Sequence, residues 1–374
     1  TAVCDVYPDR LEEAANEVEK ILGKRPLSTS NSDELLSSGI DAVIITAGWE
    51  AHIDLAVAAM KKGVRPGVEV AGAYSIDDCW RLVRTYEETG IHCMMLENCC
   101  YGQRELMITN MVRQGVFGTI VHCAGGYHHD LRELVSTGKE CRSYRLNNYI
   151  YRNCENYPTH EAGPIAKLLH INNGNRMLTL NSVSSAAVGL HEYCLAHREP
   201  GDPLRDTHFL QGDIVTTVIK CSGGQTITIT LDTTLPRLYS RAFTVRGTKG
   251  MYFEDNDSIY IDGVHQEFEW EPRKIWGNAG EYAEKYQHPL WQDFKKTDDH
   301  GGMDTLVINA FLDSVKRGKR PPIDTYDTAV LMAITPLSEE SILKGGAPVV
   351  FPDFTGGRWY RRNDIDTESE FCID

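Results

Sequence analysis

The stretch Ile40–Val70, IDAVIITAGWEAHIDLAVAAMKKGVRPGVEV, contains the pattern that decides the fold. Residues 40–46 are a continuous apolar, β-branched run, which is typical of a strand buried on both faces of a parallel sheet. Residues 52–62 carry apolar side chains at helical spacing and end at Gly63, and residues 64–70 form another short strand. A strand, a helix and a strand in this order predict one unit of a doubly wound α/β domain.

The same alternation extends in both directions and predicts a Rossmann-type domain over residues 1–118. Its remaining expected strands are 2–6 and 91–96, and its remaining helices are 9–22, 75–89 and 104–114. After residue 118 the pattern changes to short alternating strands with glycine turns, interrupted by one clear helix over 161–171. The expected strands are 120–127, 176–185, 213–221, 225–233, 243–247, 250–254 and 258–261. We therefore expect an α+β domain with a mostly antiparallel sheet over residues 119–357.

The last fifth of the chain returns to helical periodicity. Residues 304–344 contain two expected helices, 304–317 and 325–344, which we expect to pack back on the first domain. Residues 358–374 are polar and are expected to form a loosely held tail.

Composition excludes several classes of partner. The formal charge of −15 gives no general electrostatic footprint for nucleic acid or an anionic membrane, so a small molecule or glycan is the expected partner. The sequence contains no run of about 18 apolar residues, so no transmembrane helix is predicted. Eleven scattered cysteines without a CxxC pair predict reduced thiols and a cytoplasmic setting.

Asp5 stands where the second strand of a dinucleotide-binding unit commonly ends in an acidic residue that holds the ribose of NAD. The alternative is a helix cap or a surface turn. The Gly-rich loop that should precede Asp5 by about 20 residues is absent. Because the sequence starts at Thr1 rather than at Met, we expect the natural chain to be longer.

Other polar residues follow the predicted strands, where ligands bind in such sheets. Trp49 lies in the loop after residue 46 and could pack on a nicotinamide, on a sugar or on the neighbouring helix. Glu69 ends the third strand, and Glu97 with Asn98 follows the fourth. A buried Glu97 is costly unless it binds something, although it could also be a satisfied structural carboxylate.

Histidines and tyrosines gather in the second domain. Tyr127 and His129 would share one face of a strand, and His128 and His129 lack further ligands, so no metal is predicted. His160 follows a proline at a helix start, where the helix dipole favours a neutral imidazole that can act as a general base. Its alternative role is a helix cap. Arg145 and Tyr157 lie just upstream of it.

Four motifs together carry a resemblance. They are HCMMLENCCY at 92–101, YHHDLR at 127–132, YPTH at 157–160 followed by Gly163-Pro164, and HGGMD at 300–304. The chain resembles the Gfo/Idh/MocA oxidoreductase superfamily and, more narrowly, glycoside hydrolase family 109, the NAD-dependent α-N-acetylgalactosaminidases. The motifs run from residue 92 to residue 304, more than half of the chain, in a consistent order, and as a set they are specific.

The resemblance implies an NAD cofactor, a sugar substrate and a homo-oligomer. It implies that the sugar site is lined by Glu97, Arg145 and Tyr157 together with the catalytic set His160, Tyr239, Tyr127 and His129, and that Asp5, Trp49, His52, Glu69 and Asn98 lie near NAD. The implied reaction cleaves α-N-acetylgalactosaminides by oxidation, elimination, addition of water and reduction.

Two other functions stay open at this point. The first is an NAD-dependent sugar dehydrogenase that forms a 3-keto product, and the second is a non-catalytic sugar-binding relative. Ordinary dehydrogenases of the superfamily carry Glu-Lys-Pro at the third strand end, whereas this chain has Glu69-Val70-Ala71. The absent lysine favours the glycosidase.

Overall fold

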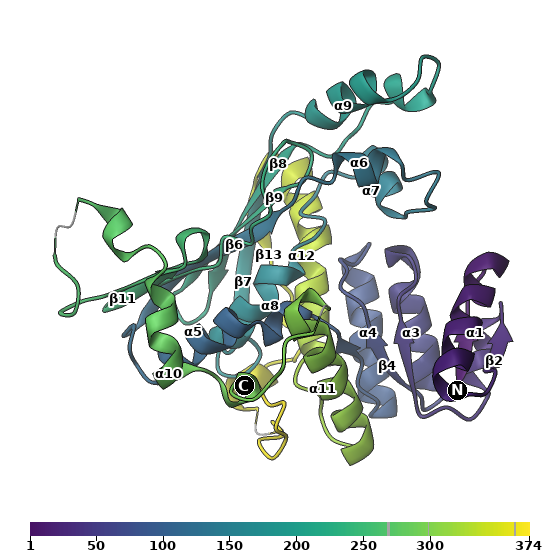
Figure 1. The fold of residues 1–374 in the computed structure, drawn as a ribbon, viewed down its shortest axis with the longest axis horizontal. Coiled ribbons are helices and arrows are strands. Elements are labelled where there is room, and N and C mark those ends of the chain that lie inside the picture. The colour runs from purple at the N-terminus through teal and green to yellow at the C-terminus, as the bar shows by residue number, and fades with distance from the viewer. Residues whose placement is uncertain (268–269, 298, 363) are drawn as a thin grey trace.

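The computed structural model describes residues 1–374 except 268–269, 298 and 363, and its first part alternates strands with helices as predicted (Figure 1). The elements are β1 (Ala2–Cys4), α1 (Pro8–Leu22), β2 (Leu27–Thr29), α2 (Ser32–Leu36), β3 (Ala42–Ile45), η1 (Trp49–Ala51), α3 (His52–Lys61), β4 (Arg65–Val68), α4 (Ile76–Thr89), β5 (Met94–Met95), η2 (Asn98–Tyr101) and α5 (Gln103–Arg113), where η marks a 3-10 helix.

Local signals explain where these helices begin and end. Pro8 occupies the first turn of α1, and Gly23 ends this helix in the left-handed conformation with φ of 67°. Ser75 caps α4 as the sequence predicts, because its side chain accepts the backbone N–H of Asp78 at 3.1 Å.

The parallel strands form two sheets instead of one continuous sheet. β1 pairs with β2, and β3, β4 and β5 form the second sheet, all in parallel register. In the doubly wound order, one strand separates these two groups. No strand among the described residues occupies the place between β1 and β3, and Ile44 of β3 is 44% exposed despite its apolar side chain.

The second part of the chain builds one eight-stranded sheet. Its strands are β6 (Ile120–His128), β7 (Met177–Ser184), β8 (Ile214–Cys221), β9 (Thr226–Asp232), β10 (Thr244–Gly247), β11 (Gly250–Phe253), β12 (Ser258–Ile261) and β13 (Val349–Val350). They lie in the order β12-β11-β10-β6-β9-β8-β7-β13, and each neighbouring pair is antiparallel except β6 with β9. The predicted fold class, an α/β unit followed by a mostly antiparallel sheet, is confirmed.

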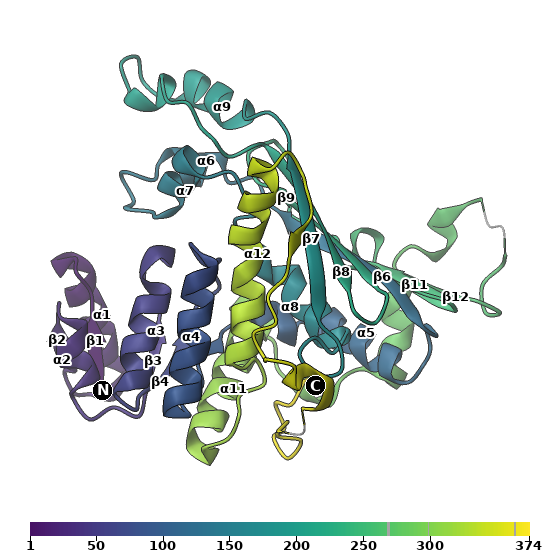
Figure 2. The same ribbon diagram turned by 180° about the vertical axis from the view of Figure 1, so that it is seen from behind.

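Helices α8 (Thr159–Leu168), α11 (Met303–Arg317) and α12 (Thr325–Leu343) join the two sheet systems. α12 packs against α4 on one side and β7 on the other, and α8 contacts both β6 and η2 (Figures 1 and 2). α12 is apolar on nearly all sides because both sheet systems surround it, and Asp324 closes its first turn with a capping box. The segment around η2 is thereby fixed between α8 and α11.

Several short helices differ from the expectation of a single clear helix in the second domain. They are α6 (Arg132–Ser136), α7 (Arg145–Tyr151), α9 (Gly189–His197) and α10 (Ala283–Tyr286), with 3-10 turns at Pro203–Arg205, Glu254–Asn256, Pro272–Ile275, Asn278–Tyr282, Pro289–Trp291, His300–Gly302 and Arg358–Arg361. Helices this short leave little periodicity in the sequence and depend on tertiary contacts. One such contact places the guanidinium of Arg132 5.1 Å from the ring centre of Tyr193.

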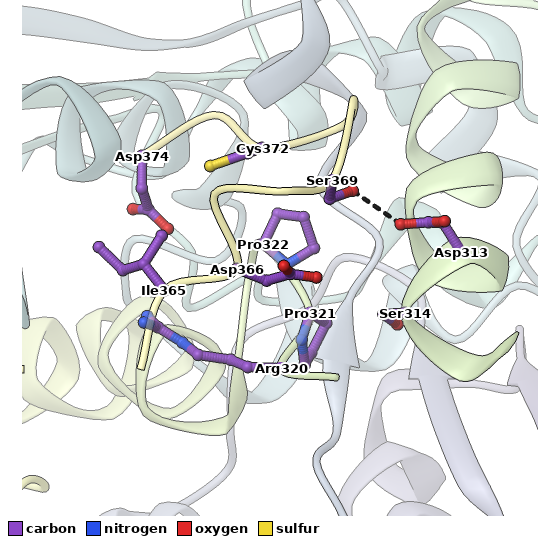
Figure 3. A pocket seen from close by; sticks show the side chains of 10 residues that line it. All are labelled: Asp313, Ser314, Arg320, Pro321, Pro322, Ile365, Asp366, Ser369, Cys372 and Asp374. Atoms are coloured by element: carbon purple, nitrogen blue, oxygen red, sulfur yellow. Dashed lines mark hydrogen bonds between the residues drawn. The ribbon is translucent and has the colours of Figure 1, made fainter. Parts of the chain in front are cut away.

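The C-terminal tail is not loosely held, contrary to the expectation. Ile373 is 1% exposed, the side chain of Asp374 pairs with Lys167 at 3.0 Å, and Ser369 donates a hydrogen bond to Asp313 of α11 at 2.7 Å (Figure 3). The cavity left between tail and helix is about 10 Å³, roughly the space of one water molecule. Buried apolar residues and paired charges hold the segment, a pattern that its polar composition conceals.

The described helices include none with the length and apolar character needed to cross a membrane.

Candidate functional site

Five predicted aromatic side chains from three separate segments lie together. The ring of Tyr127 is centred 4.3 Å from Tyr157, 5.5 Å from His160, 5.5 Å from His129 and 6.4 Å from Tyr239. His129 and Tyr239 are 5.1 Å apart, and Tyr157 and His160 are 4.9 Å apart. The fold thus gathers proton-transferring groups that are up to 112 positions apart in the sequence.

The backbone explains this assembly. Tyr127 lies near the end of β6, and His129 follows the strand. The loop that carries Tyr239 runs beside this strand end, because Ser240 forms a bridge with His128. The Tyr157 segment enters α8, which places His160 in the first turn of that helix, against β6.

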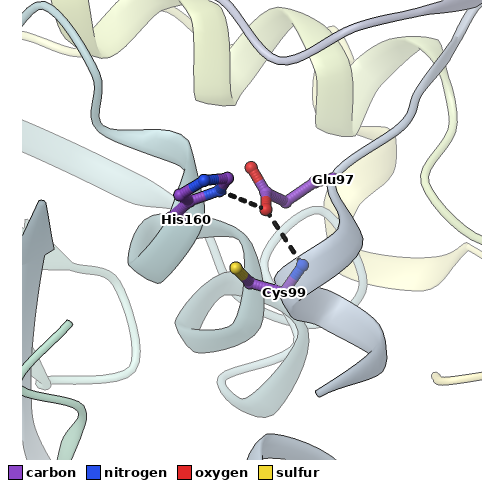
Figure 4. Close-up of side chains that lie close together, drawn as sticks. All are labelled: Glu97, Cys99 and His160. Atoms are coloured by element: carbon purple, nitrogen blue, oxygen red, sulfur yellow. Dashed lines mark hydrogen bonds and ion pairs between the residues drawn. The ribbon is translucent and has the colours of Figure 1, made fainter. Parts of the chain in front are cut away.

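His160 forms a pair with Glu97 (Figure 4). Its Nδ1 lies 2.8 Å from Oε1 of Glu97, which also accepts the backbone N–H of Cys99 at 3.1 Å. Burial opposes ionisation of Glu97, but the charge and hydrogen bond of His160 outweigh it and lower the pKa of this carboxyl. An ionised carboxylate only accepts hydrogen bonds, so Nδ1 carries the proton, and in the neutral ring Nε2 is the free proton acceptor.

Glu97 is paired with His160, and its expected contact with the sugar stays a prediction. It is 0% exposed, and it faces His160 with one oxygen while the other oxygen is buried without a hydrogen-bond partner. A carboxylate placed in this way orients an imidazole and stabilises its charged form. A carboxylate at a strand end was enough to single out Glu97 in the sequence, but it did not show that His160 is its partner.

Arg145 is stacked among aromatic rings. Its guanidinium lies 5.0 Å from the ring of Trp49, 4.7 Å from Tyr157 and 5.8 Å from Tyr144, and its Nη1 is buried without a protein partner. Trp49 is 4% exposed and packs on Tyr144 and Tyr157 with an unpartnered indole N–H, so it does not lie open for a ring to stack on. These contacts join the loop after β3 to the second sheet system.

The remaining expected residues follow strand ends of the parallel sheets. Asp5 follows β1 and accepts the backbone N–H of Tyr7 at 2.8 Å, the bond expected of a turn. Glu69 directly follows β4, and burial raises its pKa. Asn98 donates to Asp304 at 2.6 Å, which ties η2 to the start of α11.

His52 has a structural position in the first turn of α3. It is 1% exposed, and its Nε2 lies 2.8 Å from the carbonyl oxygen of Ala47, which holds the loop containing Trp49. Burial lowers the pKa of His52, so the ring is neutral in this position.

Sequence reasoning missed a buried charge cluster behind the aromatic side chains. The guanidinium of Arg241 lies 2.5 Å from Glu105, 3.6 Å from Glu161 and 3.4 Å from Glu254, and its side chain is 12% exposed. Burial raises the pKa of Glu161 and of Glu254. The four residues come from four segments, so spacing alone gives no signal, although Glu161 and Arg241 stand close to His160 and Tyr239 in the sequence.

The phenol of Tyr127 and the imidazole of His129 favour their neutral forms. Burial raises the pKa of Tyr127 to about 12, and burial together with Arg145 lowers the pKa of His129. The hydroxyl of Tyr127 lies 2.9 Å from Nδ1 of His129, within hydrogen-bond distance. A proton can therefore pass between these two groups without crossing solvent.

Comparisons with known proteins decide the family. A family model described as "Glycosyl hydrolase 109, C-terminal domain" matches residues 101–361. The chain belongs to glycosyl hydrolase family 109. It is 38% identical to a protein named alpha-N-acetylgalactosaminidase from Tannerella forsythia, over 96% of this chain and 82% of that protein. It is 40% identical to a family 109 protein of Stenotrophomonas maltophilia, over 97% and 85% of the two chains.

Solved structures of low sequence identity share the fold of this family 109 chain. Levoglucosan dehydrogenase in complex with NADH and L-sorbose aligns with a TM-score of 0.67 and 16% identity, covering 95% of this chain and 90% of that one. Myo-inositol 2-dehydrogenase from Lactobacillus plantarum aligns with a TM-score of 0.63 and 16% identity, covering 94% and 91%. The resemblance stated from the motifs is confirmed at the level of family and fold.

Glu155, on the segment that leads to Tyr157, gives the family 109 chain a pH-dependent stability. It is 0% exposed, and burial raises its pKa to about 8, whereas an unfolded chain has a glutamate pKa of about 4.3. Between these values the folded state binds more protons, so stability falls as the pH rises, by up to about 1.4 kcal/mol per pH unit. We expect Glu155→Gln to lose less stability between pH 6 and pH 8 than the wild type in urea unfolding.

An exposed residue provides the control for this prediction. Glu13→Gln on the outer face of α1 should leave the pH slope as in the wild type. Equal slopes for the wild type and Glu155→Gln would show that Glu155 is ionised in the folded protein.

Proposed function

We propose that this family 109 chain hydrolyses α-N-acetylgalactosaminides with a bound NAD that is recycled in each turnover. The observation that carries the proposal is the cluster of Tyr127, His129, His160 and Tyr239, which offers several proton donors and acceptors within one contiguous group. Family membership and the relative named alpha-N-acetylgalactosaminidase support the substrate class.

The residues present fit a dinucleotide at the carboxyl ends of the parallel strands. Asp5, Glu69 and Asn98 follow three of these ends, where an acidic side chain and an amide would bind ribose hydroxyls and the nicotinamide amide. The buried, unpartnered N–H groups of Trp49 and Arg145 are donors that a bound ligand would satisfy. When bound, NAD would accept a hydride from sugar carbon 3 and return it at the end, without net redox change.

His160 is assigned the first proton transfer. Its Nε2 would take the proton of the hydroxyl on carbon 3, and the adjacent Glu97 would stabilise the imidazolium that forms. Glu97 is thus a positioning residue, which keeps Nδ1 protonated and Nε2 free. Loss of the hydride and the proton leaves a ketone at carbon 3, which makes the hydrogen on carbon 2 acidic.

Removal of that hydrogen is assigned to Tyr127 or Tyr239. A neutral phenol is a poor base, but Tyr127 can give its own proton to Nδ1 of His129 while its oxygen takes the proton from carbon 2. The protonated His129 can then supply a proton to the departing glycosidic oxygen, and it regains one from the water that adds at carbon 1. Arg145, with its free Nη1, would bind the sugar substituents.

A sugar dehydrogenase on this fold is the competing function, favoured only by the solved neighbours. The structure supplies no lysine after Glu69, since Val70 and Ala71 are apolar and 5% and 1% exposed.

Incubation with a chromogenic α-GalNAc glycoside should release the aglycone without accumulation of NADH, and solvent deuterium should enter carbon 2. Stoichiometric NADH from free sugar, without aglycone release, would establish the dehydrogenase instead.

Tyr239→Phe should reduce turnover of the chromogenic glycoside by about 100-fold, the scale of a lost acid–base group. The substitution removes only the hydroxyl, and the ring contacts with Tyr127 and His129 remain. Tyr127→Phe is the matched variant. Whichever tyrosine acts at carbon 2, its replacement by phenylalanine should abolish deuterium incorporation at that carbon. Wild-type turnover in both variants would refute both assignments.

A further inference from the structure

One group of ligand-bearing side chains in the described residues has the composition of a metal site. Atoms of Glu97, Cys99 and His160 all lie within 4.8 Å of one another (Figure 4). They supply one carboxylate oxygen, one thiol sulfur and one imidazole nitrogen, the donor types that zinc prefers. Magnesium and calcium prefer sites made of oxygen alone, so this set selects a thiophilic cation.

A second observation also points to a ligand. The oxygen Oε2 of Glu97 is buried and makes no hydrogen bond of regular geometry, which is costly for a carboxylate, although the Thr159 hydroxyl lies near enough to help lower the pKa of Glu97. The Cys99 thiol lies near the cation Arg241, the carboxylates of Glu97 and Glu105, and Glu161, whose pKa burial raises so that its neutral form is favoured. A divalent cation would therefore enter surroundings with an excess of acidic groups.

The geometry permits coordination after a small adjustment. Zinc binds sulfur at about 2.3 Å and nitrogen or oxygen at about 2.0–2.2 Å, so its ligands lie roughly 3.3–3.8 Å apart. His160 and Glu97 are 2.8 Å apart at their nearest atoms and must separate by about half an ångström, while the Cys99 sulfur, within 4.8 Å of both, must lie within about 3.8 Å of each. Solvent reaches the group through His160, whose side chain is 14% exposed while Glu97 and Cys99 are buried.

We propose that Glu97, Cys99 and His160 form an inhibitory binding site for a zinc-type cation. Nδ1 of His160 must then offer its lone pair to the metal, so the ring proton moves to Nε2. Starting from the neutral imidazole, Cys99 loses its thiol proton to solvent and Glu97 is already ionised, so one proton leaves for each metal bound. With Nε2 protonated, His160 no longer accepts a proton from a substrate hydroxyl.

The test measures binding of zinc chloride by calorimetry in the wild type, Cys99→Ser and Cys100→Ser. Cys100 is an equally buried neighbouring thiol outside the ligand group, which makes it the matched control. Loss of a partner outside the first coordination sphere typically costs 10–100-fold in affinity, so loss of the sulfur ligand should weaken binding by at least about 10-fold. Cys100→Ser should bind as the wild type, and magnesium should bind none of them at this site.

Proton release separates this site from zinc bound by surface histidines. Titrations in buffers of different ionisation enthalpy should show about one proton released per Cys99-dependent metal. Equal affinity in wild type and Cys99→Ser, or an equal loss in Cys100→Ser, would overturn the proposal. These readouts need no turnover, so the metal site can fail or stand independently of the proposed glycosidase activity; inhibition of glycoside cleavage by zinc then tests its consequence.

Discussion

Replacement of His160 by asparagine should lower kcat for an α-GalNAc glycoside by between about 100- and 10,000-fold, the range for loss of a general base. The amide N–H of asparagine can still donate to Glu97, so the buried carboxylate keeps a partner, as it does with Nδ1 of the imidazole. The amide cannot accept a proton, which removes only the chemical step. Steady-state kinetics should therefore show a fall in kcat with KM close to that of the wild type.

Alanine at the same position serves as the comparison. His160→Ala removes both the base and the partner of Glu97, so it should lose stability as well as kcat. If asparagine retains wild-type kcat, His160 does not take the proton. If asparagine raises KM as strongly as it lowers kcat, the residue acts in sugar binding.

The parts of the fold that the sequence predicts well are those with strong local patterns. The run at β3, the helix α3 with its terminal glycine and the capped α4 each carry a signal within a few residues. The split between the β1–β2 and β3–β5 sheets has no such signal, because pairing depends on which strand lies between them. The short helices α6 and α9 likewise depend on contacts such as Arg132 with Tyr193.

The site shows the same division. Motifs predicted that Tyr127, His129, His160 and Tyr239 meet, and the structure brings their rings together. The hydrogen-bond and charge partners of these side chains could not be predicted, because they come from distant segments that only the folded chain brings together.

The sequence thus indicates that burial of Glu97 costs free energy unless the carboxylate has a partner. Only the packing of η2 against α8 shows that this partner is His160. The prediction that residues 358–374 are loosely held was wrong for a related reason. Its charges suggested a solvated segment, whereas Lys167 neutralises Asp374 in the interior.

Arg241→Met should destabilise the protein by about 3–5 kcal/mol, the cost of breaking a buried ion pair by removal of one partner. The side chain is 12% exposed and is the cation shared by Glu105, Glu161 and Glu254. Methionine fills a similar volume but leaves the ionised members of this group without a positive charge, so they must take up protons or water. A lower midpoint in urea unfolding, more marked at pH 8 than at pH 6, is the expected result.

Two variants separate charge from shape in this cluster. Burial raises the pKa of Glu161 well above its ordinary value, so this residue is already neutral, and Glu161→Gln should change stability little. Arg241→Lys keeps the positive charge but lacks the planar guanidinium, so its stability should lie between that of the wild type and that of Arg241→Met. Because the carbonyl oxygen of Arg241 accepts the N–H of Gly126 at 2.8 Å, this residue also fixes the loop of Tyr239 against β6. Wild-type stability of Arg241→Met would mean that the three carboxylates are all protonated, and Glu161→Gln as damaging as Arg241→Met would mean that Glu161 is ionised.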